Sequence, residues 1–181
     1  CNTDGVGFVS SLVNDLNYQI KPKSNIFFIG SGGAAYGIIA SLIEVNPRMI
    51  EITNRTKSSV EKLVSHFERY VPRGTMIIKA WGQSPGKETN LVINSSACGM
   101  KKGDSFNLNF ESLSSEALVY DIIYNPRKTI LMKLAETEKI KSSNGIYMLV
   151  RQAAESFRKW FNISLKNSDV DEVIKLLGTR L

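Results

Sequence analysis

Short apolar segments alternate with amphipathic segments along the chain. The apolar segments are rich in Ile, Val and Phe, which is typical of strands buried in a parallel sheet. They predict six strands, at residues 25–30, 49–53, 76–81, 91–94, 117–123 and 139–143. Between them, apolar residues recur at intervals of three and four, the period of a helix with one buried face.

This helical period occurs in six stretches, at residues 9–16, 31–45, 60–67, 131–135, 148–160 and 170–177. Residues 101–116 are polar and are expected to be irregular. Alternating strands and helices favour parallel pairing with right-handed crossovers. The predicted fold class is therefore α/β, a Rossmann-like doubly wound sheet. We expect six mainly parallel strands with helices on both faces, plus C-terminal helices.

A glycine-rich turn joins the first strand to the helix that follows it. The turn consists of Gly30, Ser31, Gly32, Gly33 and Ala34. With Ala35 it forms the pattern G-x-G-x-x-A, in which small residues permit a tight turn and let a pyrophosphate approach the backbone. The unpaired N–H groups of the helix N-terminus favour an anion there. Glycine turns between strands and helices are common, so the motif alone is a weak indication of a dinucleotide site.

Polar residues also follow the second, fourth and fifth strands, at residues 54–57, 94–100 and 122–125. In open parallel sheets, ligands bind beyond the carboxyl ends of the strands. The agreement of four strand ends therefore supports a ligand site more strongly than the glycine turn does alone.

The end of the second strand indicates which dinucleotide is bound. An NAD site usually has Asp or Glu there, about 20 residues beyond the glycines. This chain has Asn54, Arg55, Thr56 and Lys57 instead. A guanidinium suits a 2′-phosphate, which favours NADP(H). The alternative is that Arg55 and Lys57 are ordinary exposed loop charges.

Three further residues have both a structural and a functional interpretation. Asp4 precedes a helical stretch, so it is either a helix N-cap or a catalytic group. Gln152 interrupts an apolar helical face, so it either ties down backbone or faces a ligand. Tyr124 follows a strand end and is either an aromatic plug or a ligand contact. Cys98 has no neighbouring base and is not expected to be a nucleophile.

Composition narrows the function classes. The chain has 181 residues, 43% of them hydrophobic and 22% charged, with a net charge of +6. Its basic residues are scattered, so we expect no nucleic-acid role. No apolar run reaches the ~18 residues of a membrane helix, no signal peptide is visible, and the cysteines show no disulfide or metal-ligand spacing. We expect a cytoplasmic protein without a membrane partner and without a metal site.

The chain resembles the shikimate dehydrogenase family over nearly its whole length. The motifs that carry the resemblance are Asn2-Thr3-Asp4-Gly5 with Gly7, the turn at residues 30–35, Asn54-Arg55-Thr56, Asn94-Ser95 with Gly99-Met100, Tyr120-Asp121 with Tyr124-Asn125-Pro126 and Thr129, and Gly145 with Met148-Leu149-Val150 and Gln152-Ala153-Ala154. Their order and spacing together are specific, although no single motif would suffice.

The family reduces 3-dehydroshikimate to shikimate with NADPH, in aromatic amino acid biosynthesis. The resemblance implies that Asp4 is catalytic and binds substrate together with Gln152 and Tyr124. It implies that Gly30, Ser31, Gly32, Gly33 and Ala34 hold the pyrophosphate, that Asn54, Arg55, Thr56 and Lys57 hold the 2′-phosphate, and that Ile122, Gly145 and Met148 line the nicotinamide side.

One departure limits what the resemblance implies. The family has a substrate domain before its Asn-Thr-Asp-Gly motif, and that domain supplies the catalytic lysine, whereas this chain begins at Cys1. We therefore expect residues 1–144 to be an NADP-binding domain with a leading interdomain helix. Residues 145–181 would be helices that pack on the absent substrate domain. The chain alone should bind NADP(H), turn over shikimate poorly, and self-associate through faces left open.

Two alternatives stay open at this point. A quinate/shikimate dehydrogenase would differ in substrate range or use NAD, and the missing domain would hold much of the information that separates it. A non-catalytic NADP-binding module would keep the cofactor site without the chemistry.

Overall fold

The computed structural model describes residues 2–101 and 103–180, and Cys1 lies outside the described residues. The strands are β1 (Asn25–Ile29), β2 (Met49–Thr53), β3 (Met76–Ile78), β4 (Thr89–Asn94), β5 (Leu118–Asp121) and β6 (Lys141–Ser143). The helices are α1 (Asp4–Asn14), α2 (Gly33–Glu44), α3 (Lys57–Phe67), the short 3₁₀ helix η1 (Glu68–Tyr70), α4 (Ile130–Thr137), α5 (Ile146–Phe161) and α6 (Asn167–Arg180).

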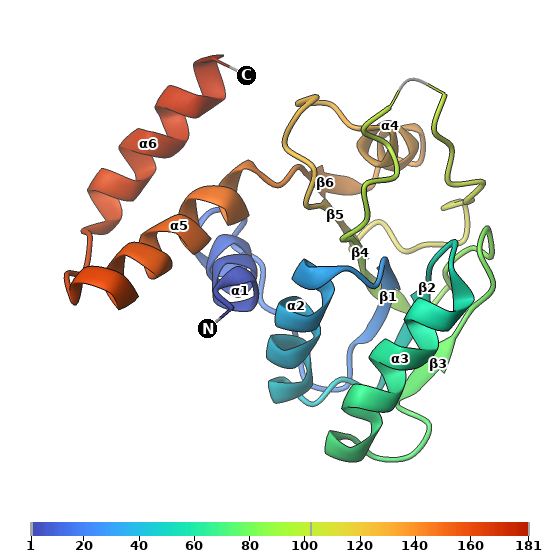
Figure 1. Ribbon diagram of the computed structural model, residues 1–181. Coiled ribbons are helices and arrows are strands. Elements are labelled where there is room, and N and C mark those ends of the chain that lie inside the picture. Colours follow the sequence, from blue (N-terminus) through green and yellow to red (C-terminus); the bar gives the residue numbers. More distant parts are fainter. Residues whose placement is uncertain (1, 102, 181) are drawn as a thin grey trace.

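The six strands form one parallel sheet in the order β3-β2-β1-β4-β5-β6. The order reverses direction between β1 and β4, which makes the sheet doubly wound. The predicted α/β class, the parallel pairing and the strand count are confirmed. The carboxyl ends of β1, β2, β4 and β5 lie at one edge, as Figure 1 shows.

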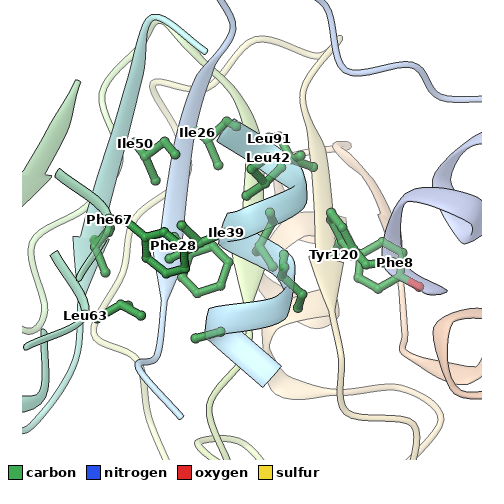
Figure 2. Close-up of a cluster of buried hydrophobic side chains, with 14 of the residues drawn as sticks. Phe8, Ile26, Phe28, Ile39, Leu42, Ile50, Leu63, Phe67, Leu91 and Tyr120 are labelled. Carbon is green, nitrogen blue, oxygen red and sulfur yellow. The ribbon is translucent and has the colours of Figure 1, made fainter. Parts of the chain in front are cut away.

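Alternate residues of the strands form two separate cores. Ile26 and Phe28 of β1 pack with the apolar faces of α1, α2 and α3, including Phe8 and Ile39 (Figure 2). Phe27 and Ile29 point to the other face, where α4 and the segment after β4 cover them. Because side chains of a strand alternate between faces, a continuous apolar strand requires cover on both sides.

Helix α1 lies between α2 and α5, and the contacts on both sides are close (Figure 1). A Cβ on Gly5 would collide with the carbonyl of Gly37 in α2, and one on Gly7 would come within 2.5 Å of the Gln152 Cβ in α5. Gly5 and Gly7, two residues apart and directed to opposite sides of α1, thus let the three helices pack closely.

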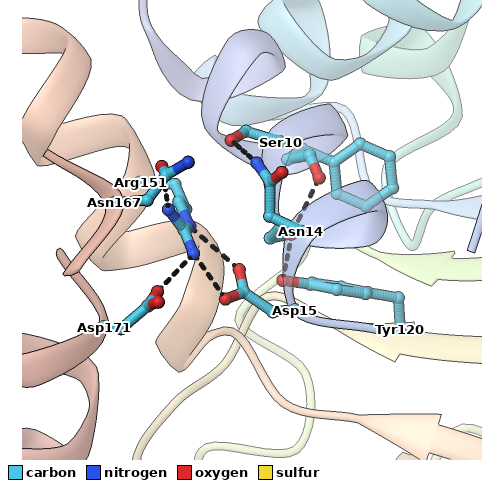
Figure 3. Close-up of polar contacts among 9 residues, drawn as sticks. Ser10, Asn14, Asp15, Tyr120, Arg151, Asn167 and Asp171 are labelled. Atoms are coloured by element: carbon cyan, nitrogen blue, oxygen red, sulfur yellow. Dashed lines mark hydrogen bonds and ion pairs between the residues drawn. The ribbon is translucent and has the colours of Figure 1, made fainter. Parts of the chain in front are cut away.

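Arg151 joins the terminal helices to the rest of the molecule (Figure 3). Its buried guanidinium donates to both carboxylate oxygens of Asp15, at 3.0 and 2.8 Å. It also donates to Asn167 at 3.2 Å and to Asp171 at 2.8 Å, both on α6. One side chain therefore links the end of α1, the middle of α5 and the start of α6.

Several element boundaries differ from the predictions. The third strand ends at Ile78 rather than at 81. It is an exposed edge strand, and the chain turns away after it, where the Ala80 N–H donates to the Gln83 side-chain oxygen. The last helix is longer than 170–177 and begins at Asn167. The polar segment expected to be irregular lacks helix and strand over its described residues 101 and 103–116, yet Phe106 and Phe110 anchor it in the second core.

Candidate functional site

The glycine turn is built from backbone contacts that bring two strand ends together. Gly30 has φ of +112°, a conformation that L side chains rarely adopt. A Cβ there would come within 2.6 Å of the Ser95 hydroxyl. Ser95 itself donates its N–H and its hydroxyl to the Ile29 carbonyl, at 2.7 and 3.0 Å. Gly30 is therefore required by the protein's own packing.

The next two glycines are not required by packing. Nothing lies within 4 Å of a Cβ built on Gly32 or on Gly33, and both residues are exposed. Gly32 is the N-cap of α2 and has no side chain to satisfy the first N–H groups of the helix. The turn therefore presents open space in front of unpaired N–H groups, which is the arrangement that binds a pyrophosphate. The half-buried Ser31 and Ala34 flank this opening.

The end of β2 places a cation beside this turn. Gly30 donates its N–H to the Thr53 carbonyl at 2.8 Å, so the two strand ends are hydrogen-bonded to each other. Arg55 is exposed just beyond, and its side chain has neither a hydrogen bond nor an ion pair within residues 2–101 and 103–180. Lys57 is paired with Glu61 of its own helix at 3.6 Å. Arg55 is thus the more available cation of the two.

The loop after β4 approaches the same cation. Asp104 accepts from the backbone N–H groups of Lys101 and Gly99, at 3.1 and 2.9 Å. These two hydrogen bonds, with a smaller contribution from the Arg55 charge, lower the pKa of Asp104. The positive side chain therefore faces a loop that already holds one carboxylate.

A cavity of about 380 Å³ lies at the carboxyl ends of β4 and β5. It is lined by Ser95, Ser96, Ala97, Met100, Ile122, Ile123, Tyr124 and Asn125. Two of the predicted residues, Ile122 and Tyr124, therefore meet in it. Gly145 lies behind Ile122, where a Cβ would collide with the Ile122 carbonyl. Met148 is only 5% exposed and packs in the first core near Tyr120.

Two buried side chains join the strand ends beneath this cavity. Asn94, the last residue of β4, donates its amide to Asp121 of β5 at 2.8 Å. Burial raises the pKa of the Asp121 carboxyl to about 6, while Thr129, the Ile123 N–H and Asn94 act in the opposite direction. Oδ2 of Asp121 is buried without a partner in hydrogen-bond geometry.

Gln152 of α5 contacts the residue that precedes α1, and Asp4 is the first residue of that helix. Thr3 donates its hydroxyl to the Gln152 side-chain oxygen at 3.1 Å and contacts the Ser156 hydroxyl at 2.9 Å. The N-cap interpretation of Asp4 is wrong, because Thr3 occupies the N-cap and Asp4 is the first helical residue. No hydrogen bond joins Tyr124 to Asp4 or Gln152 in the described part of the chain.

Sequence reasoning gave no role to four residues that organise this region: Thr3, Asn94, Asp121 and Arg151. A signal for two of them was present, since Asn94 and Asp121 are polar residues that end otherwise apolar strands. Among the residues the structure describes, no group of three or more His, Cys, Asp or Glu side chains could hold a metal ion. None of the described helices combines the length and apolar character needed to cross a bilayer.

Comparison with known proteins gives consistent relatives. The NADP(+)-dependent shikimate dehydrogenase of Prochlorococcus marinus strain MIT 9215 is 38% identical over 172 residues, which are 89% of this chain and 58% of that protein. The chain spans between 56% and 63% of the length of the curated relatives it matches. No protein-family model matches the chain.

Solved structures agree with the sequence comparison. A shikimate dehydrogenase in complex with NADP+ has a TM-score of 0.81 at 28% identity, with 96% of this chain and 60% of that chain covered. The ligand-free 5-ketofructose reductase of Gluconobacter sp. strain CHM43 has a TM-score of 0.82 at 27% identity, with 97% and 63% covered. From its sequence and its fold together, the chain is a homologue of shikimate dehydrogenases over part of their length.

Proposed function

We propose that this chain binds NADP(H) and forms the cofactor-binding part of an enzyme that reversibly reduces 3-dehydroshikimate to shikimate. The observation that carries the proposal is the open glycine turn with Arg55 beside it. A Cβ would meet nothing at Gly32 or Gly33, and the neighbouring strand end offers an exposed guanidinium and no carboxylate. The relatives named as NADP(+)-dependent shikimate dehydrogenases support the substrate assignment.

The residues of this chain would contact the cofactor in three places. Gly30, Ser31, Gly32, Gly33 and Ala34 would hold the pyrophosphate, and Asn54, Arg55, Thr56 and Lys57 would hold the 2′-phosphate. Ile122 would line the nicotinamide side of the cavity, with Gly145 and Met148 behind it. When bound there, NADPH would supply a hydride to the substrate carbonyl.

Asp4 and Gln152 would bind the substrate next to this region. Asp4 lies in the first turn of α1, where a carboxylate is favoured by the unpaired N–H groups. Its side chain makes no hydrogen bond or ion pair with residues 2–101 or 103–180, so it is available to a substrate hydroxyl. Tyr124, which is 40% exposed and lines the cavity at the ends of β4 and β5, would contact the substrate from there.

The remaining parts of the proposal concern the whole protein. Residues 1–144 act as the NADP-binding domain, and residues 145–181 pack against a further domain that completes the substrate pocket and supplies a lysine for proton transfer. Exposed apolar side chains at the end of α5 support this packing, including Trp160 at 77% and Phe161 at 58%. We place the protein in the cytoplasm and assign it no nucleic-acid partner.

Titration of the 181-residue chain with NADPH and with NADH, followed by nicotinamide fluorescence, tests the cofactor assignment. A charge-assisted hydrogen bond contributes about 1.5–3 kcal/mol, so Arg55→Ala should weaken NADPH at least about tenfold and NADH less than about twofold. Arg48→Ala is the matched control, because it removes an exposed arginine just before the opposite end of the same strand. Equal weakening of both cofactors by Arg55→Ala would contradict the 2′-phosphate role.

Turnover provides a separate test. Proton transfer by a positioned group contributes about 10²–10⁴-fold, so the chain alone should oxidise shikimate with NADP+ negligibly even where it binds the cofactor. Substantial shikimate-dependent formation of NADPH by these 181 residues would contradict the need for a further domain.

A further inference from the structure

The carboxyl ends of β4 and β5 are joined by one buried amide–carboxylate pair. Asn94 and Asp121 are each 0% exposed, and the Asn94 amide donates to Oδ1 of Asp121 at 2.8 Å. The same two strands are also joined by the Ile122 N–H, which donates to the Asn94 carbonyl at 3.0 Å. The pair therefore lies at the last register position before both chains leave the sheet.

Each member of the pair also holds the loop that follows its own strand. The Asn94 amide donates to the Cys98 carbonyl at 3.2 Å, and its side-chain oxygen accepts from the N–H and hydroxyl of Ser96, at 3.0 and 2.7 Å. Asp121 Oδ1 accepts from the Ile123 N–H at 3.1 Å. The hydrogen bonds of the two side chains are thus directed mainly at each other and at the two loops, and Asp121 also interacts with the Thr129 hydroxyl.

These two loops are the walls of the cavity at the edge of the sheet. One wall consists of residues 95–97 with Met100, and the other consists of residues 122–125. Neither Asn94 nor Asp121 lines the cavity, since both lie beneath it. A change in the pair would therefore move the walls relative to each other without removing a contact from a ligand.

We infer that Asn94 and Asp121 are positioning residues for the nicotinamide half of the cofactor, acting through the two loops that they hold. The inference rests on the proposed NADP(H) site. It adds that the Asn94 and Asp121 side chains set the shape of the nicotinamide end of that site. The adenosine end lies at Arg55 and the glycine turn, and none of the pair's hydrogen bonds reaches those residues.

The state of Asp121 Oδ2 supports a positioning role over a purely stabilising one. This oxygen is buried without a hydrogen bond of good geometry, although the Thr129 hydroxyl interacts with the same carboxyl, and a poorly paired buried polar group destabilises a fold. An apolar pair at the same place would avoid that cost. A carboxylate that accepts from two donors through one oxygen instead fixes the angle between the two loops.

Two ligands separate positioning from general loss of structure. NADPH contains both halves of the cofactor, whereas adenosine 2′,5′-bisphosphate contains the 2′-phosphate and adenosine but no nicotinamide. Both are titrated against the 181-residue chain by calorimetry. Asn94→Asp, which turns the donor toward Cys98 and Asp121 into an acceptor, should weaken NADPH at least about fivefold and change the bisphosphate less than about twofold.

Conservative and matched variants complete the experiment. Asp121→Asn keeps an oxygen that can accept from Asn94 and Ile123, so it should retain most of the NADPH affinity that Asp121→Ala loses. Ser96→Ala removes a loop hydroxyl that donates to Asn94 and accepts from the Cys98 N–H. It should give a smaller loss of the same kind, and it provides the test if Asn94→Asp does not fold. Asn25→Ala is the control, because it removes a buried amide at the amino end of β1. It should leave the ratio of the two affinities unchanged.

The outcomes distinguish the inference from the proposed function. A wild-type chain that binds neither ligand contradicts the proposed NADP(H) site itself. A wild-type chain that binds both, combined with variants that weaken both equally, overturns only the positioning role. Equal affinity of the wild-type chain for the two ligands also overturns it, because the cavity then holds no nicotinamide.

Discussion

At the scale of single residues, the three glycines of the turn differ in why the structure requires or permits a glycine at each position. Gly30 is required by a positive φ and by Ser95, whereas Gly32 and Gly33 face open space. At the carboxyl end of a strand and the N-terminus of a helix, such open space leaves room for an anionic ligand to approach the backbone. The place of a glycine in the sequence motif does not show whether packing requires it or whether it faces open space. The atoms that surround it in the structure do show this.

Gly33→Ala should therefore change stability and binding in opposite directions. Gly33 is the first residue of α2, so alanine should leave the free energy of unfolding equal or raise it by up to about 1 kcal/mol. The added methyl occupies the space in front of the helix N-terminus, so NADPH affinity should fall about tenfold. Urea unfolding and fluorescence titration measure the two effects.

Gly86→Ala is the matched control for this prediction. It also meets nothing within 4 Å, but it lies in the exposed loop before β4. It should leave NADPH affinity unchanged. Unchanged affinity in Gly33→Ala as well would show that no ligand approaches the turn closely.

Asp121 should make stability depend on pH. Burial raises the pKa of this carboxyl to about 6 in the folded state, above its value of 3.8 in the unfolded chain. The stabilisation that goes with its protonated form is thus complete below about pH 4 and is lost as the pH rises through about 6. Asp121→Asn has no such loss, so the difference in free energy of unfolding between this variant and wild type should rise by about 2–3 kcal/mol between pH 4 and 7. Parallel curves for the two proteins would contradict the assignment.

At the scale of elements, helix α6 depends on a few polar contacts. Val170 is its one buried hydrophobic residue among those whose side chains the structure describes, and Arg151 provides its links to α5 and α1. The Asp15 carboxylate is 7% exposed, whereas that of Asp171 is 52% exposed. The two ion pairs of Arg151 should therefore have very different energies.

Arg151→Leu should lower the free energy of unfolding by about 3 kcal/mol, because it leaves the buried Asp15 carboxylate unpaired. Asp171→Ala removes the exposed partner and should cost less than about 1 kcal/mol. Amide hydrogen exchange should quicken in α6 in both variants, and in the α1–α5 contact in Arg151→Leu alone. Equal destabilisation by both variants would show that Asp15 is not the dominant partner.

At the scale of the whole molecule, an apolar surface is exposed at the end of α5 and in the turn that follows. Its side chains are Trp160, Phe161, Ile163 and Leu165. Exposed apolar side chains gathered in a short stretch of chain are typical of interaction sites when they form one surface. In the 181-residue chain studied alone, we expect this surface to drive self-association.

Trp160→Lys should reduce that self-association. Sedimentation velocity at increasing concentrations should show a larger weight-average mass for the wild-type chain than for the variant. NADPH affinity should be equal in both, because Trp160 lies far along α5 from Gly145. A wild-type chain that stays monomeric at high concentration would contradict the prediction.

The sequence by itself determined the fold class and predicted that the candidate site lies at the carboxyl ends of the strands. Apolar strands alternating with helices require a parallel sheet covered on both faces, and parallel strands place their carboxyl ends together. The turn at Gly30 and the cation at Arg55 follow from local residue chemistry, so they were also predictable. The short third strand was not, since the end of an edge strand depends on side chains such as Gln83 rather than on its own apolar pattern.

Only the tertiary structure decided which groups act on one another across the chain. Asn94 and Asp121, Arg151 and Asp15, and Thr3 and Gln152 are each separated by many residues, and their pairing depends on strand register and helix packing. Burial likewise gives Asp121 a raised pKa that no local pattern contains. Periodicity reports how each element is built, whereas a polar contact between elements exists only after hydrophobic packing has set their distance and angle.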